Sequence, residues 1–443
     1  MQESKGPEGP SEPAVQASPD AIRARARQEA RNILHLYLDI AWQGLIAAGI
    51  STYLAVYLVR LGASALLIGL LTSLPALVTI LFSIPSAYFL AGRRDLISVV
   101  NWSRLGARLS YLAIAAVPYL LTGDRLSLAP VVVVGIWSLS AVFSSVTTPA
   151  WTSVYAAAVP PRRRPQINGG RWALFSLITA VAVSLFGRLL DVVPSPTNYQ
   201  LIFVLSFIAG LFSIYHFGQL HLPEASGPSS LPPSPWRTLA ASGVLKRYLV
   251  GTFVYRLGIS LPAALYPLYW VGTLGASDTL IGLRTTAGYG ALVVAYFIWG
   301  RIAVHYGHRR VLLASSLGLA IYPALTALAR TPAALVPIAL VWGAFAAGID
   351  HSFFESLLQA APAEERASAA ALDATVANVA VCVGPLVGTT LAGLVGFPLA
   401  FVASGGLCVA GTGLFWVLRV GHRQPQPPAE PGAAGRRTVS IGG

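Results

Sequence analysis

The chain has 443 residues, of which 55% are hydrophobic and 11% are charged, and its mean hydropathy is +0.65. Soluble domains carry roughly 25% charged residues, so the composition excludes a chain that folds mainly in water. The formal net charge of +13 would suit a nucleic-acid partner, but the positions of the charges argue against one.

The first 30 residues predict a tail outside any folded bundle. Residues 1–20 are rich in Pro, Glu, Ser and Gly, a composition typical of disordered segments. The tail ends in a short basic helix, AIRARARQEARN at 21–32, which we expect to lie on the inner membrane surface. No apolar core follows a short basic start, so we expect no signal peptide.

Twelve apolar runs follow, each long enough for a membrane helix, which needs about 20 residues. Membrane strands alternate in segments of about 10 residues, whereas these runs are continuous. We therefore expect an all-α polytopic membrane protein. It would consist of an N-terminal bundle (31–221), a cytoplasmic linker (222–246), a C-terminal bundle (247–420) and a disordered tail (421–443). The runs lie near 33–59, 65–90, 98–121, 128–157, 168–190, 199–220, 247–271, 279–303, 311–329, 333–358, 369–395 and 398–419.

Positive charge gathers on one side of these runs. If both termini face the cytoplasm, 24 of the 30 Lys and Arg residues lie in the tails or at cytoplasmic helix ends. Cytoplasmic loops of membrane proteins usually carry this excess. The sequence thus predicts a multi-pass protein of the cytoplasmic membrane, with both termini inside and no nucleic-acid partner.

An internal repeat divides the chain into two similar halves. LGASALLIGL at 61–70 and LGASDTLIGL at 274–283 share eight of ten positions and begin 213 residues apart. A second match aligns Pro160 and Arg164 with Pro362 and Arg366, before the fifth and eleventh runs. Two matches in the same order predict two pseudo-symmetric six-helix bundles that are parallel repeats, because six crossings return the chain to one side.

A basic turn follows the second run of each half, AGRR at 91–94 and GHRR at 307–310. The second turn lies in GRIAVHYGHRR, which resembles the signature G-x-L-A-D-[RK]-x-G-[RK]-[RK] of the major facilitator superfamily. With the six-plus-six layout and the long linker, the chain resembles a transporter of this family over about 30–420. Val304 replaces the acidic residue of the signature. The matching residues are Gly92, Arg93 and Arg94 in the first half and Gly300, Gly307, Arg309 and Arg310 in the second.

The resemblance implies secondary active transport, in which two bundles rock about a central cavity. The sequence has no G-x-x-x-x-G-K-[ST] phosphate loop, so we expect coupling to protons rather than to ATP. Efflux of a small amphipathic organic solute is favoured over uptake of a sugar or a carboxylate. An intramembrane lipid-modifying enzyme and a non-transporting receptor are the alternatives from other classes. We expect no cofactor and no metal site. We also expect a monomer, because one duplicated chain encloses a complete cavity.

Ionisable residues inside membrane helices are costly and mark candidate sites. Asp39 lies about two turns into the first run, with His35 and Gln43 at helical spacing on the same face. One interpretation is a polar stripe that lines the cavity, with Asp39 as a proton or cation site. The other is a helix end at the interface, held by hydrogen bonds to its neighbours.

The tenth run contains three further candidates in GIDHSFFES: Asp350, His351 and Glu355. His351 and Glu355 are four residues apart and can share a helix face. A histidine–carboxylate pair can relay a proton near neutral pH. Alternatively, Glu355 only ties down the cytoplasmic end of the helix.

Arg256 lies deep in the seventh run and needs an anionic partner. Asp350, Asp39 and a substrate group are the candidates. The resemblance places the seventh and tenth helices around the cavity, so we expect a static bridge between Arg256 and Asp350. The neighbouring Tyr255 either packs in the bundle or, if it faces the cavity, favours an amphipathic substrate.

Arg171 and Asp373 occupy equivalent places in the two halves under the Pro160/Pro362 register. The resemblance brings the fifth and eleventh helices together, so a bridge between these residues would close the inner side. A partly exposed bridge contributes roughly 0–1 kcal/mol, which suits a gate that must open. The alternative is two unrelated charges at the interface.

Three other arginines are expected to face lipid. Arg284 lies near the outer end of the eighth run and should snorkel to the membrane surface. Arg104 and Arg108 share one face at the start of the third run, where we expect lipid phosphates or helix ends as partners.

Overall fold

The computed structural model describes residues 19–90, 92–195, 197–222, 235–361 and 365–421. This part of the chain is helical and contains no strand, so the prediction of an all-α fold is confirmed. Residues 1–18, 223–234 and 422–443 of the predicted tails and linker lie outside the described residues. The predicted boundaries of the two bundles stay predictions.

The first half of the chain contains six long helical segments joined by short turns. The first segment is interrupted by one turn of π-helix, η1. The elements are α1 (Pro19–Ile46), η1 (Ala47–Ser51), α2 (Thr52–Arg60), α3 (Ala65–Leu90), α4 (Leu96–Leu120), η2 (Gly123–Leu128), α5 (Ala129–Ala158), α6 (Arg164–Val192) and α7 (Thr197–Gly218).

The second half has the same plan after the short helix α8. Its first long segment ends in a π-helical turn, η3. The first long segment of each half therefore contains a π-helical turn. The elements are α8 (Pro235–Ala241), α9 (Gly243–Ser260), α10 (Leu265–Pro267), η3 (Leu268–Thr273), α11 (Asp278–Tyr306), α12 (His308–Leu328), η4 (Pro332–Ala334), α13 (Leu335–Ala360), α14 (Arg366–Val395) and α15 (Phe397–Val417).

Eleven helical segments of the described chain are long and apolar enough to cross a membrane. α4 is not among them, because Arg104 and Arg108 lower its hydropathy. It nevertheless has 25 residues and packs between α5 and α7 as a full member of the bundle. Eleven of the twelve predicted helices are thus recognised by their apolar sequences, and the twelfth, α4, is recognised by its packing in the bundle.

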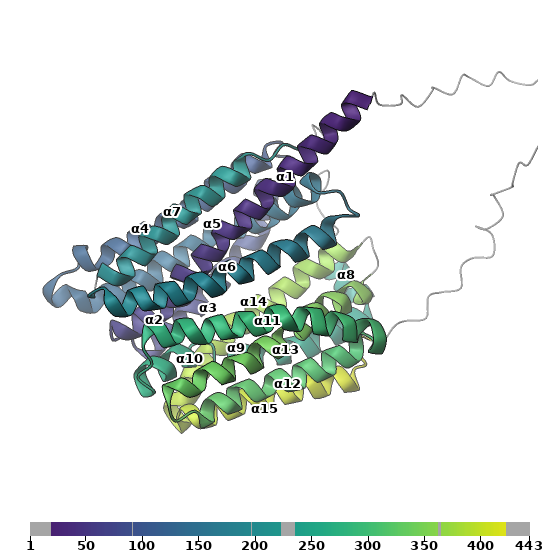
Figure 1. Ribbon diagram of the computed structural model, residues 1–443. Helices are drawn as coiled ribbons and strands as arrows, with labels where there is room; N and C mark the ends of the chain where they lie inside the picture. The colour runs from purple at the N-terminus through teal and green to yellow at the C-terminus, as the bar shows by residue number, and fades with distance from the viewer. Residues whose placement is uncertain (1–18, 91, 196, 223–234, 362–364, 422–443) are drawn as a thin grey trace, which may run out of the picture.

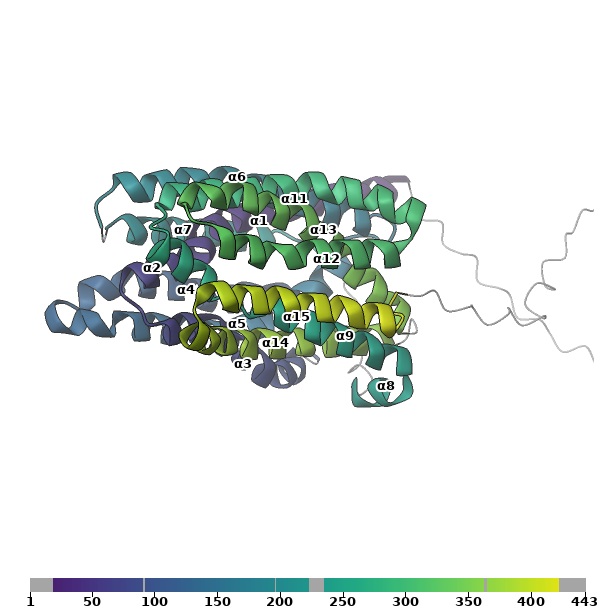
Figure 2. The ribbon, with the colours of Figure 1, turned by 90° about the horizontal axis from the view of Figure 1, so that it is seen from below.

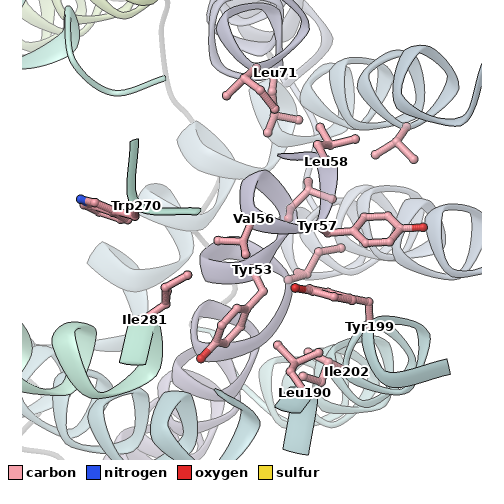
Figure 3. Packing of buried hydrophobic residues seen from close by; sticks show 14 of the residues in the cluster. Tyr53, Val56, Tyr57, Leu58, Leu71, Leu190, Tyr199, Ile202, Trp270 and Ile281 are labelled. Carbon is pink, nitrogen blue, oxygen red and sulfur yellow. The ribbon is translucent and has the colours of Figure 1, made fainter. Parts of the chain in front are cut away.

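Two helix pairs join the halves: α6 packs along α11, and α3 packs along α14 (Figure 2). The N-terminal end of α1, the helix α8 and the C-terminal end of α15 lie at one end of the bundle in both views (Figure 1). We call this the tail end and the other the loop end. The largest buried apolar cluster lies toward the loop end and joins Tyr53, Tyr57 and Tyr199 to Trp270 and Ile281 of the second half (Figure 3).

The basic turns occupy the same place in both halves. Gly92 and Gly307 follow α3 and α11 with φ angles of +76° and +83°. Only glycine adopts this backbone region at little cost, which explains the glycine in each turn. Arg93 donates a 3.0 Å hydrogen bond to the carbonyl of Phe89, and Arg309 donates one of 3.2 Å to the carbonyl of Trp416, so both arginines hold helix ends.

Asp95 caps the N-terminus of α4 beside the first basic turn. Its Oδ1 accepts a 3.0 Å hydrogen bond from the backbone N–H of Ser98. Hydrogen bonds from the side chain and backbone of Ser98 lower the pKa of the Asp95 carboxyl from its ordinary value. A carboxyl with a lowered folded-state pKa stabilises the fold above its unfolded pKa and loses that contribution as pH falls through its folded pKa.

Asp95→Ala is therefore expected to destabilise the protein by about 1 kcal/mol at about pH 7, as other N-cap substitutions do. The difference should disappear in acid, once the cap of the wild-type protein is protonated. Thermal unfolding of both proteins in detergent, from neutral to strongly acidic pH, measures it. A difference that stays constant with pH would contradict the cap's charge as its source.

Candidate functional site

A fully buried charge cluster surrounds Asp39 in the first half. Arg104 of α4 donates from Nη1 to Asp39 Oδ1 at 2.8 Å, and Nη2 of Arg171 lies 4.0 Å from Oδ2. The hydroxyl of Ser213 donates to Oδ1 at 2.7 Å. The Arg104 prediction was wrong: Arg104 is 6% exposed and faces Asp39 rather than lipid, since an acid inside the bundle needs a buried cation.

The other members of the predicted stripe also face neighbouring helices. His35 Nδ1 lies 3.2 Å from Nδ1 of His216 on α7. Gln43 donates to Ser213 Oγ at 3.0 Å and accepts from Arg108 at 2.9 Å. The stripe therefore packs against α4 and α7, and it lines neither of the two cavities described below. The expectation that Arg108 contacts lipid phosphates or helix ends was also wrong, because its guanidinium donates a hydrogen bond to Gln43.

A second charged pair links α9 and α14 in the other half. Arg256 donates to both carboxylate oxygens of Asp373, at 2.7 and 2.9 Å, and to the Asp373 carbonyl at 3.0 Å. Its guanidinium also lies 5.0 Å from the centroid of the Phe353 ring. The predicted partner Asp350 was wrong, because α14 packs on α9 and brings Asp373 to the guanidinium.

The predicted bridge between Arg171 and Asp373 is not formed in this structure. In this structure α6 packs on α11 and α14 packs on α3, and an inner gate formed by Arg171 and Asp373 stays a prediction. Each residue instead pairs with the first long helix of its own half: Arg171 with Asp39, and Asp373 with Arg256. The repeat thus conserves a link between its first and fifth helices while the signs of the charges are exchanged.

A cavity of about 310 Å³ lies between α6 of the first half and the second half. Asp350 lies on its wall, near the middle of α13, and accepts a 2.9 Å hydrogen bond from the hydroxyl of Tyr296 on α11. Asp350 is an exposed residue that lines this cavity. The wall is otherwise mostly apolar and aromatic, formed by Trp172, Phe175, Ser176, Ile259, Tyr289, Leu292, Leu319, Trp342, Ala346 and Ile349.

Three other candidate residues lie outside this cavity. The ring of His351 lies tilted against that of His308, with centroids 5.3 Å apart, and neither His351 nor the half-buried Glu355 lines the cavity. Tyr255 is fully buried and donates to the carbonyl of Ser316 at 3.1 Å, so it packs inside the bundle.

A second cavity, of about 240 Å³, adjoins the first, because Tyr289 and Trp342 line both. Arg284 lies on its wall, with its guanidinium 4.0 Å from the centroid of the Trp270 ring and a 2.6 Å hydrogen bond to the hydroxyl of Tyr322. The expectation that Arg284 snorkels to the membrane surface was therefore wrong. The signal that could have shown this is the small and polar face formed by Thr285 and Gly288 beside it.

Polar contacts between the halves gather at the loop end, around the start of α11. Asp278 accepts hydrogen bonds of 2.9 and 3.0 Å from Tyr199 and lies 3.3 Å from Nε of Arg60. The Asp191 carboxylate accepts hydrogen bonds of 3.0 and 2.9 Å from the backbone N–H groups of Asp278 and Thr279. Helix N-termini attract such carboxylates, and these contacts tie α2, α6 and α7 to the second half.

Close helix contact accompanies these bonds. A Cβ atom on Gly282 of α11 would lie 2.7 Å from the Val183 carbonyl oxygen and 2.8 Å from the Tyr53 hydroxyl. That hydroxyl donates to the carbonyls of Val183 and Asp278 at 2.9 and 3.2 Å. The two halves are therefore sealed at the loop end through backbone as well as side chains.

Comparison with known proteins gives one family model and several similar transporters. A family model described as Major Facilitator Superfamily matches residues 248–441. The staphyloferrin B transporter of Staphylococcus aureus (strain NCTC 8325 / PS 47) is 28% identical over 149 residues, which are 33% of this chain. The match spans only 35% of that relative's length.

Two solved structures share the fold of nearly the whole chain. The nucleoside transporter NupG is 13% identical with a TM-score of 0.69, over 87% of this chain and 99% of that one. A bacterial homologue of the iron transporter ferroportin, in an inward-facing state, is 15% identical with a TM-score of 0.69, over 89% and 98%. Together with the described helices, these matches show a multi-pass membrane protein with the fold of these transporters, whose residues 248–441 match the model of the Major Facilitator Superfamily.

Proposed function

We propose that the chain is a secondary active transporter that moves a small organic solute across the cytoplasmic membrane by alternating access. The observation that carries the proposal is an aromatic cavity with one exposed carboxylate, Asp350, next to an interface whose polar contacts gather at the loop end. The similar proteins are named as transporters of staphyloferrin B and of nucleosides. A solute held in the cavity would move when the loop end opens.

The charge distribution orients this transporter. With both termini in the cytoplasm, the loop end faces outward, and the structure represents an inward-facing state. The similarity to an inward-facing structure supports this assignment. The Arg60–Asp278 pair then serves as a gate that closes the outer side, and Arg171–Asp373 remains the candidate gate of the inner side.

Proton coupling rests on Asp350. It lies 15 residues from the start of α13 and 10 from its end, about 22 Å and about 15 Å along the helix, so it lies well inside this helix. A carboxylate at this depth that is exposed to a cavity can exchange a proton with whichever side the cavity faces. The aromatic wall suits an amphipathic solute, and we favour efflux over uptake. We expect the transporter to act as a monomer, without enzymatic activity.

The test uses purified protein in sealed vesicles with an imposed pH gradient. The solute is the amphipathic compound that most raises the unfolding temperature in a thermal-shift screen. The gradient should drive its accumulation, and a protonophore should abolish that accumulation. A solute that binds but crosses only by passive leak, at the same rate in protein-free vesicles, would overturn the proposal.

Asp350→Asn is expected to abolish accumulation driven by the pH gradient, because the amide cannot carry a proton. Exchange of labelled for unlabelled solute, which needs no net proton movement, should continue. Glu355→Gln is the matched control on the same helix, since its side chain lies outside the cavity wall, and it should transport like wild type. Gradient-driven accumulation by Asp350→Asn at the wild-type rate would exclude Asp350 as the proton carrier.

A further inference from the structure

Arg284 has a position that the transport cycle outlined above does not explain. It lies six residues after the start of α11, about 9 Å along the helix, and its side chain faces the 240 Å³ cavity. None of the ion pairs among the described residues includes Arg284, whereas Arg60, Arg104, Arg171 and Arg256 each have an aspartate. A cationic side chain at this depth is costly unless an anion compensates it.

The wall around Arg284 offers further hydrogen-bond donors. A guanidinium has five N–H donors, and the bond to Tyr322 uses one of them. Trp270 is 8% exposed, lines the same cavity, and its Nε1–H has no hydrogen-bond partner within the described residues. Figure 3 shows this nitrogen on the side of the ring that points away from Tyr53 and Ile281. A buried donor without a partner costs roughly 1–3 kcal/mol, which a bound acceptor would recover.

We infer that Arg284 and Trp270 form a binding subsite for the carboxylate of an organic monoanion. The inference rests on the proposed transport function and names its substrate class. A planar carboxylate matches the fork of the guanidinium, which stacking on Trp270 holds in place.

The rest of the ligand follows from the adjoining cavity. Tyr289 and Trp342 lie between the two cavities, with ring centroids 5.9 Å apart in an edge-to-face arrangement. An aromatic or alicyclic body attached to the carboxylate packs on these rings and extends into the 310 Å³ cavity. Asp350 on that wall repels a second anionic group, so the subsite selects a monoanion over a dianion.

The same observations favour Arg284 over Arg256 as the residue that binds a substrate carboxylate. Asp373 already occupies the fork of Arg256 with two hydrogen bonds and neutralises it. A substrate carboxylate would have to displace that acid. At Arg284 it would meet donors that no acid occupies.

The test measures binding of a panel of aromatic and alicyclic carboxylates, each paired with its primary amide of equal shape, to the purified full chain in detergent. At least one carboxylate should bind tighter than its amide. Arg284→Gln should weaken the affinity for that carboxylate roughly 10- to 100-fold. Trp270→Phe, which keeps an aromatic ring but removes the N–H donor, should weaken it roughly 2- to 10-fold. Arg330→Gln, which removes an exposed arginine from the same half, is the control and should bind like wild type.

Two outcomes overturn the inference: no carboxylate in the panel binds better than its amide, or the preference survives both Arg284→Gln and Trp270→Phe. The transport proposal fails separately. If sealed vesicles accumulate a neutral or cationic solute and Arg284→Gln leaves that accumulation unchanged, the protein is a transporter without a carboxylate subsite. If a carboxylate binds at Arg284 yet no panel member crosses the membrane, the subsite stands and the transport proposal does not.

Discussion

Asp39→Asn is expected to destabilise the protein by about 3–5 kcal/mol, the cost of breaking a buried ion pair by removing one partner. Asp39 is completely buried, and its carboxylate is the acid shared by Arg104 and Arg171, which are 6% and 2% exposed. An amide can still accept a hydrogen bond, but it leaves two guanidinium groups in the bundle without a compensating charge.

Thermal unfolding and the yield of monodisperse protein in detergent measure this effect. Asp124→Asn is the control, because Asp124 is an exposed acid in the turn η2 and its loss should change little. Adding Arg104→Gln to Asp39→Asn should recover part of the lost stability, since it removes one of the two uncompensated cations. A double variant no more stable than Asp39→Asn alone would show that charge compensation is not the role of Asp39.

The sequence was sufficient to predict the helices of this protein, because each one had to be long and apolar and to end at a charged or glycine-rich turn. It also indicated the repeat, since the two copies retain the turn glycines that a left-handed backbone requires. α4 shows the limit of apolarity as a signal. Its arginines make it resemble an interfacial helix until Asp39, on another helix, accounts for one of them.

Partners across helices were harder to predict, for a physical reason. Helical periodicity says which residues share a face but not which helix packs against that face. Arg256 was identified as needing an anionic partner, yet the residues proposed as that partner belonged to the wrong helices. Arg256 pairs with Asp373 rather than Asp350 because α9 packs against α14, and the sequence of neither helix alone predicts that contact.

Arg284 illustrates the same limit at the candidate site. From its position near a helix end, snorkelling was the economical interpretation. What directs it inward is Trp270, 14 residues earlier and across an irregular π-helical turn, a separation that no regular periodicity connects. Asp350 was singled out because an acid within an apolar run marks a candidate site, and its role stays a prediction.

Gly282→Val is expected to shift the conformational equilibrium toward a state open at the loop end. At this position α11 lies against α6, where any Cβ would approach the Val183 carbonyl oxygen and the Tyr53 hydroxyl to less than 3.0 Å. Overpacking of this kind costs typically 1–3 kcal/mol. The cost is paid only while the interface is closed, so the ratio of open to closed protein should rise roughly 5- to 100-fold.

The measurement is the rate at which a membrane-impermeant maleimide, added from the loop side, modifies a cysteine introduced as Thr52→Cys in protein lacking Cys382 and Cys408. Thr52 lines the 240 Å³ cavity next to the sealed end, so the reagent reaches it from that side only when the halves separate there. Gly290→Val is the matched control on the same helix, since a Cβ at Gly290 meets nothing within 4 Å. Equal rates in Gly282→Val and Gly290→Val would mean that this contact does not gate the cavity. A faster rate in Gly282→Val alone would show that opening requires separation of α6 from α11, the motion on which the proposed alternating access depends.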